Sequence, residues 1–217
     1  MIFRSSVVEM ASEQKITKRK PGRPSGSNAE EVILAGAWQA FAKHGFHDCT
    51  VAYILAFSGT SRTNFYRFFK SKEEVFARIL EISIGVLEKE MDKAFVSARQ
   101  LPTLEERLDC ISETYVNSCF TAGDILPVLF QEQHTLPQHK ILREKLFKKL
   151  HKGIEKLIVE DGHAKPDPLL VQGIMSGIDR VVLMASLKRG SVESKKEKAI
   201  EVVRHLYKSI LYYAQRL

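Results

Sequence analysis

Residues 50–74 have the sequence TVAYILAFSGTSRTNFYRFFKSKEE, and this stretch decides the fold. A threonine, which is a favoured N-cap, opens a short predicted helix over residues 50–57. Residues 58–60 form a tight turn, in which Gly59 supplies the positive φ that a sharp turn between helices needs. A second short helix is predicted over residues 61–68. Two short helices joined by a glycine-containing turn are the helix-turn-helix arrangement.

The second short helix offers a polar surface beside an apolar one. Ile54, Leu55, Phe65 and Phe69 are apolar and can hold the two helices at a fixed angle. The other face carries hydrogen-bond donors and acceptors suited to base edges and phosphates in a major groove. Its residues are Ser61, Arg62, Thr63, Asn64, Tyr66 and Arg67. The pattern therefore indicates a helix that binds nucleic acid.

The rest of the sequence has helical periodicity from Glu30 nearly to the end, and no run alternates with the period of a strand. We predict an all-α chain of about nine helices, three in an N-terminal helix-turn-helix domain and six in a C-terminal helical domain. The expected helices cover residues 29–44, 50–57, 61–68, 71–99, 103–122, 124–134, 137–162, 167–189 and 194 to the end. A Ser194-x-x-Glu197 capping box is expected to open the last of them.

Charge is concentrated near the start of the chain. Residues 1–72 hold 11 Lys and Arg against 5 Asp and Glu, whereas the remainder holds 22 and 21. This asymmetry favours nucleic acid or an acidic surface as partner, and a solvated basic tail is the alternative. We expect three segments: a disordered basic arm over residues 1–28, the helix-turn-helix domain over 29–76, and the C-terminal helical domain over 77–217.

Cellular location is inferred from cysteines and from apolar runs. The three cysteines form neither a CxxC motif nor a Cys/His cluster with metal-ligand spacing, so we expect reduced core residues and no metal site. No run of about 18–20 apolar residues indicates a membrane span, and residues 1–10 lack the apolar region of a secretory signal. A cytoplasmic protein that does not act at a membrane is expected.

Residues from about Val32 to Phe76 resemble the tetracycline-repressor (TetR) family of bacterial transcription regulators. The segment FAKHGF at 41–46 matches that family's F-x-x-x-G-(Y/F) ending of the first helix. The matches that continue in register are Thr50-Val51, Ile54, Gly59, Ser61, Phe65-Tyr66, Phe68-Phe69 and Ser71-Lys72-Glu73. The departures are Leu55, Ser58, Thr60, Thr63 and Asn64, and the last two lie on the helix that faces DNA.

The resemblance implies that the helix over residues 61–68 is the recognition helix for double-stranded operator DNA. Thr50, Tyr66 and Lys72 match positions that commonly contact phosphate. Candidates for base or phosphate contacts are Ser61, Arg62, Thr63, Asn64 and Arg67. As alternatives, Thr50 and Ser61 act only as helix caps, and Tyr66 is a half-buried packing residue.

The basic arm contains a further candidate site. Gly22-Arg23-Pro24 within a basic run is similar to the core of an AT-hook, and narrow A·T minor grooves attract arginine. The candidate residues are Lys18, Arg19, Lys20 and Arg23. The alternative is a tail that only keeps the chain in solution.

The last two predicted helices carry apolar and small residues at three- and four-residue steps, a spacing that suits helix-to-helix association. In proteins of the TetR family two such helices form the interface of a homodimer. The corresponding candidates are Gly173, Gly177, Val181, Val202, Leu206, Ile210 and Tyr213. Packing inside one protomer is the alternative.

The resemblance also implies a pocket for a small-molecule effector among the middle helices. Candidate lining residues are Tyr115, Cys119, Phe120, Phe130, His134, Met175 and Asp179, and each is alternatively a core residue. Neither a catalytic motif nor a bound cofactor is indicated. We therefore expect a homodimeric repressor that an unidentified effector releases from its operator. A TetR-like DNA-binding protein without an effector and a helical enzyme with a basic tail remain open.

Overall fold

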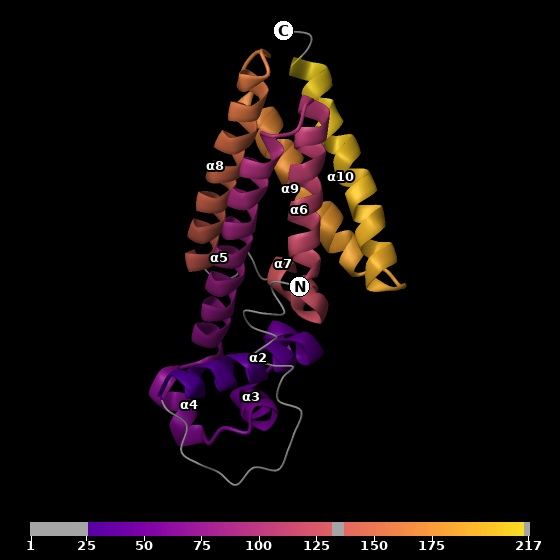
Figure 1. Ribbon diagram of the computed structural model, residues 1–217. Coiled ribbons are helices and arrows are strands. Elements are labelled where there is room, and N and C mark those ends of the chain that lie inside the picture. The colour runs from indigo at the N-terminus through magenta and orange to yellow at the C-terminus, as the bar shows by residue number, and fades with distance from the viewer. Residues whose placement is uncertain (1–25, 132–136, 215–217) are drawn as a thin grey trace. The chain divides into compact units, whose positions relative to one another are not determined.

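The computed structural model describes residues 26–131 and 137–214 (Figure 1). Within these ranges every regular element is helical, and nine α-helices confirm the predicted all-α class. They are α2 (Gly26–Asp48), α3 (Val51–Ser58), α4 (Arg62–Phe68), α5 (Lys72–Ala98), α6 (Leu104–Phe120), α7 (Leu126–Gln131), α8 (Pro137–Glu160), α9 (Pro168–Ser186) and α10 (Val192–Ala214). A short 3-10 turn, η2 (Gly123–Ile125), precedes α7.

Three helices differ most clearly from their predicted bounds. Helix α2 begins at Gly26, and helical residues continue to Asp48 across a kink at Gly45 (φ 72°, ψ 175°). The expected single helix over 124–134 is the 3-10 turn η2 followed by α7. The prediction that Ser194 opens the last helix is wrong, because Ser191 caps α10 by accepting from the Ser194 N–H at 3.2 Å.

Side chains cap the starts of two helices in the second unit, α6 and α9. The Thr103 Oγ1 accepts from the Glu106 N–H at 3.2 Å while the Glu106 carboxylate accepts from the Thr103 N–H at 3.1 Å, which is a reciprocal capping box. The Asp167 carboxylate accepts from the N–H groups of Leu169 and Leu170 at the start of α9, with Pro168 at the first helical position. In both helices a side chain thus accepts from N–H groups of the first turn, which have no partner within the helix.

The chain divides into two compact units. The first unit comprises the described parts of residues 1–83 and 121–139, and the second comprises those of residues 84–120 and 140–217. Helix α5 contributes residues to both. The predicted domain division at residue 76 stays a prediction.

An aromatic core holds the first unit together. Phe41 of α2, Phe65 of α4 and Phe76 of α5 are fully buried. The ring of Phe76 meets that of Phe41 edge-on at 5.0 Å and that of Phe46 at 4.7 Å. Such pairs add to the gain from burial because edge-to-face rings are electrostatically favourable. The start of α5 is thereby packed on the end of α2.

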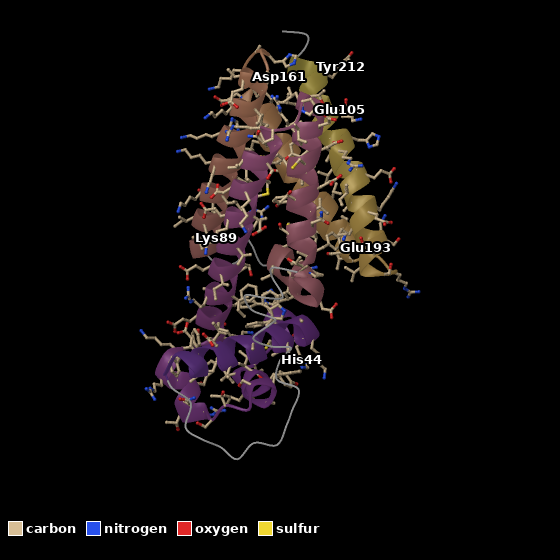
Figure 2. All side chains as sticks on the ribbon, viewed as in Figure 1. His44, Lys89, Glu105, Asp161, Glu193 and Tyr212 are labelled. Carbon is tan, nitrogen blue, oxygen red and sulfur yellow. The ribbon has the colours of Figure 1, made fainter. Side chains whose placement is uncertain are left out.

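Helices α6, α8, α9 and α10, with the later part of α5, form the second unit. Helix α10 packs on α9 and α6 and buries Val203 and Tyr207. The Lys208 ammonium pairs with the Glu105 carboxylate across α10 and α6 at 2.6 Å; Glu105 is labelled in Figure 2. Helix α8 is tied to α5 by Lys149, whose Nζ lies 3.0 Å from Glu88 and 2.7 Å from Asp92.

Among the described residues, helix α9 is the one helix that is both long and apolar enough to cross a membrane. Its 19 residues and mean hydropathy of 1.4 would suffice for a membrane span by length and composition. The helix nevertheless carries Asp179 and Arg180 near its centre, and 44% of it is buried inside the protein. Core helices of globular proteins share this composition, so hydropathy alone is weak evidence for a membrane.

The closest approach of α2 to α3 generates the first prediction. A Cβ atom on Gly36 would lie 2.5 Å from the Ser58 backbone nitrogen, so the two helices can meet only because residue 36 is glycine. We expect Gly36→Ala to lower the free energy of unfolding by about 1–3 kcal/mol, because the overpacked backbone cannot relax. The fluorescence of Trp38, which is buried in the same unit and is the only tryptophan, follows unfolding in denaturant.

Gly85→Ala is the matched control. Gly85 lies within α5, and nothing is found within 4 Å of an added Cβ atom there. Its replacement should raise stability by about 0.5–1 kcal/mol, because alanine has the higher helix propensity. Equal effects of the two substitutions would contradict the steric account.

Candidate functional site

The turn between α3 and α4 has the geometry of a helix-turn-helix. Gly59 ends α3 in the left-handed region (φ 64°, ψ 14°). Thr50 caps α3 by accepting from the Tyr53 N–H at 3.4 Å, and Ser61 caps α4 by accepting from the Asn64 N–H at 3.2 Å. Both hydroxyl groups are therefore helix caps, as one alternative held. Each keeps its own O–H hydrogen as a donor, so capping leaves a phosphate contact open.

Helix α4 turns one face inward and the other outward. Phe65 is fully buried, whereas Tyr66 is 48% exposed. The exposure of Tyr66 argues against the half-buried packing role. The predicted contact residues Ser61, Arg62, Thr63, Tyr66 and Arg67 are exposed, and Asn64 is half-buried. The structure therefore brings all six together on or beside one short helix, with the Arg67 guanidinium 5.5 Å from the Phe68 ring centroid.

Lys72 is engaged within the protein. Its Nζ donates to the carbonyl oxygens of Phe46 at 2.7 Å, of His47 at 2.8 Å and of Cys49 at 2.8 Å. An ammonium has three donors, and a cation is favourable where helix carbonyls end. Lys72 therefore closes the end of α2 and fixes the start of α5. The family position alone did not reveal this role, because the partners lie 23–26 residues earlier.

Sequence reasoning missed an aromatic stack beside the turn. The His44 ring lies flat on the Tyr53 ring, with centroids 4.1 Å apart and planes within 7° (His44 is labelled in Figure 2). Phe57 meets His44 edge-on, and the Lys43 ammonium lies 5.6 Å from the Phe57 ring centroid. This stack joins the end of α2 to the outer face of α3. No periodicity in the sequence pointed to it.

A buried polar cluster occupies the second unit. The Tyr115 hydroxyl on α6 donates to one carboxylate oxygen of Asp179 on α9, and the Arg143 guanidinium on α8 pairs with the other. Asp179 is only 4% exposed, and the Tyr115 ring is buried beside the Cys119 thiol. Three of the predicted effector residues are thus in direct contact. Arg143 was not predicted, because its helix is rich in basic residues and spacing does not single it out.

The buried setting of this cluster shifts its pKa values. Burial raises the pKa of the Tyr115 hydroxyl well above its usual value and that of the Cys119 thiol to about 12. Burial also lowers the pKa of the Arg143 guanidinium, because the charged form loses hydration. Tyr115 and Cys119 therefore stay neutral at physiological pH and serve as hydrogen-bonding groups.

A groove of about 410 Å³ lies between α8 and α9 in the same unit. Phe147 and Met175 provide its apolar lining. The volume is within the range of small-molecule sites. Of the other predicted effector residues, Phe120 is buried in the second unit and Phe130 in the first. His134 lies outside the described residues, and so do Lys18, Arg19, Lys20 and Arg23.

The predicted dimer residues form part of an incompletely covered face of α9 and α10. Gly173 is exposed, whereas Gly177, Val181, Val202 and Leu206 are half-buried. Leu206 reaches across to α9, where its Cδ1 would lie 3.8 Å from a Cβ on Gly177. Exposed apolar side chains continue this face along α9 at Leu169, Met184 and Leu187. Ile210 and Tyr213 belong to α10, and their side chains lie outside what the structure describes.

Comparison with known proteins finds a family match over the helix-turn-helix segment. Residues 33–79 match the family described as "Bacterial regulatory proteins, tetR family". The chain is 33% identical over 58 residues to the HTH-type transcriptional regulator YdgC of Bacillus subtilis (strain 168), covering 27% of this chain and 30% of that one. It is 26% identical over 134 residues to YfiR of the same organism, covering 57% of this chain and 64% of YfiR. The chain thus spans less than two thirds of either relative.

The fold extends the similarity beyond the matched segment. The transcriptional regulator FadR from Bacillus subtilis, solved in complex with stearoyl-CoA, superposes with a TM-score of 0.61 at 15% identity, covering 79% of this chain and 96% of FadR. Residues 33–79 therefore form a helix-turn-helix segment of the kind described as the tetR family of bacterial regulatory proteins. The family consists of regulators and not of enzymes, which confirms that part of the sequence prediction.

The three hydrogen bonds of Lys72 generate the second prediction. Lys72→Met removes the ammonium and keeps most of the aliphatic stem, so three carbonyl groups at the end of α2 lose their donor. We expect the free energy of unfolding of the first unit to fall by about 1.5–3 kcal/mol, the usual range for a hydrogen bond to a charged group. The change is measured by denaturant titration followed at Trp38.

Lys70→Met removes the same charge two residues earlier, at an exposed position. This control should leave stability nearly unchanged. If both variants are as stable as the parent protein, Lys72 does not hold α2 and α5 together.

Proposed function

We propose that this protein is a DNA-binding transcription regulator that uses α4 as its recognition helix. The observation that carries the proposal is the exposed polar face of α4, held by two capped helix starts and the left-handed Gly59. Side chains that project from a rigid element suit the major groove, which displays a distinct donor and acceptor pattern for each base pair. The predicted arm over residues 1–28 would add minor-groove or electrostatic contacts.

The proposed regulator works as a homodimer. Along α9, Leu169, Gly173, Met184 and Leu187 are exposed at helical spacing, and contiguous apolar surface of this kind is typical of an association site. Small residues such as Gly173 allow close helix approach. A two-fold dimer presents two recognition helices to successive turns of DNA, about 34–36 Å apart. Pairing through α9 and α10 therefore fits a palindromic operator.

A small-molecule effector is proposed to release this dimer from its operator in the cytoplasm. The groove between α8 and α9 and the buried cluster at Asp179 support an effector site within residues 77–217. The similarity in fold to FadR, which was solved with stearoyl-CoA, is consistent with an effector in such a domain. The effector acts only through its different affinity for the free and DNA-bound states.

Selection of bound sequences from a random DNA pool tests the proposed function and yields the third prediction. Arg62→Ala should relax the preference at one base position at a cost of about 1–3 kcal/mol, because it removes a base-edge contact. Tyr66→Phe should weaken binding to all sequences about equally, because a phosphate contact positions the protein without specifying sequence.

Glu81→Gln, on the exposed face of α5, is the control and should leave the selected sequence and its affinity unchanged. Failure of the parent protein to enrich any sequence would rule out the proposed function. An unchanged preference in Arg62→Ala would mean that another residue reads the base.

A further inference from the structure

The two helices that line the groove, α8 and α9, also carry the ion pair of Arg143 and Asp179, each partner one helical turn from a groove residue. The Arg143 guanidinium lies 4.5 Å from the centroid of the Phe147 ring, and Phe147 lines the groove. On α9, Met175 lines the groove and Asp179 follows one helical turn later. On each helix, the residue of the ion pair is therefore the next one along the face that carries an apolar groove residue.

The groove is lined by two lysines and two glutamates, and each glutamate has a lysine partner outside the lining. Glu155 is already neutralised by Lys165 at 2.9 Å, and Glu144 lies 3.9 Å from Lys140. Lys148 and Lys152 are exposed in the same lining, and neither makes an ion pair within the part of the chain that the structure describes. An anion that enters the groove is therefore attracted by these two lysines, and both glutamates of the lining are already paired with other lysines.

Arg143 already pairs with a carboxylate, which is that of Asp179. A guanidinium binds carboxylates through a planar set of donors, often two at a time. Asp179 does not depend on Arg143 alone, because its other oxygen accepts from the Tyr115 hydroxyl. The contact with Arg143 can therefore be exchanged while Asp179 keeps one partner.

We propose that this groove binds an amphipathic carboxylic acid, whose apolar tail packs on Phe147 and Met175 and whose carboxylate replaces Asp179 at Arg143. The proposal rests on the proposed function and names the chemical class of its effector. The exchange removes the ion pair that joins α8 to α9 and leaves the hydrogen bond that joins α6 to α9. Ligand binding thereby releases α8 from its ion pair with α9.

Three probes with the same alkyl chain test the head group: decanoate, decanol and decylamine. Binding to the full-length protein is measured by titration calorimetry. Decanoate should bind at least about tenfold more tightly than decanol, because only the carboxylate forms charge-assisted bonds to the guanidinium. Decylamine should bind more weakly still, because Arg143 and the two lysines of the lining repel it.

Two variants test the exchange. Asp179→Asn removes the competing carboxylate, so decanoate should bind at least about tenfold more tightly, and its addition should raise the melting temperature more than in the parent protein. Combining Arg143→Gln with Asp179→Asn leaves no unpaired buried charge and should abolish the preference for decanoate over decanol. Arg99→Gln, which breaks an ion pair with Glu160, is the control and should bind decanoate like the parent.

Equal affinity for the three probes would overturn the proposal, and so would unchanged decanoate binding in Asp179→Asn. Should the double variant fail to fold, Asp179→Asn still decides, because a site without exchange predicts no gain in affinity. Operator binding is measured on the same preparations without ligand. Loss of the head-group preference with intact DNA binding defeats this inference alone, whereas absence of any selected DNA sequence defeats the proposed function.

Discussion

The arrangement of the helix-turn-helix depends on how closely α2 and α3 approach each other at Gly36. An added Cβ atom would lie 2.5 Å from backbone and side-chain atoms of Ser58, so a glycine is required there. Ser58 immediately precedes Gly59, whose left-handed conformation directs the chain into α4. The packing of one helix pair therefore fixes where the turn begins and, through it, which face of α4 is exposed.

The second unit is organised around a different constraint, the burial of charge. Asp179 is buried and the Arg143 side chain is only 18% exposed, and an ion pair in such a setting gains little stability because desolvation offsets the attraction. Apolar side chains at these positions would hold α8 to α9 at least as well. The pair therefore makes more sense as part of a binding site, since perturbed charged groups concentrate where ligands bind.

Much of the first unit could be predicted from sequence because its signals are local. Thr50, Gly59 and Ser61 define helix ends within a few residues of themselves, and the polar pattern of residues 61–67 follows from a single helical period. The same local signal misplaced the start of α10, where Ser191 and Ser194 both resemble caps. Gly190, with φ of 130°, ends the preceding loop, and the next residue, Ser191, is the one that caps the helix.

The remaining features depend on contacts between residues distant in sequence. Lys72 bonds to carbonyls that no motif marks, and Arg143 meets Asp179 across 36 residues. Periodicity can place both residues on helices but cannot show which partners they meet. The same limit applies to α9, whose apolar composition fits a core helix, a membrane span or a dimer seam equally well. Only the exposure of Gly173, Met184 and Leu187 in the folded chain favours the seam.

A dimer formed through α9 and α10 is proposed to bind DNA, and Gly173→Glu tests this mode of binding most directly. Nothing lies within 4 Å of an added Cβ atom at Gly173, so the substitution leaves the protomer folded while it places a charge on the proposed seam. Gln172→Glu adds the same charge one residue earlier, on the groove side of α9. Sedimentation equilibrium and titration of a palindromic operator should show a monomer with operator affinity lowered by orders of magnitude for Gly173→Glu, and a DNA-binding dimer for Gln172→Glu. A Gly173→Glu monomer that binds the full operator with undiminished affinity would contradict the account.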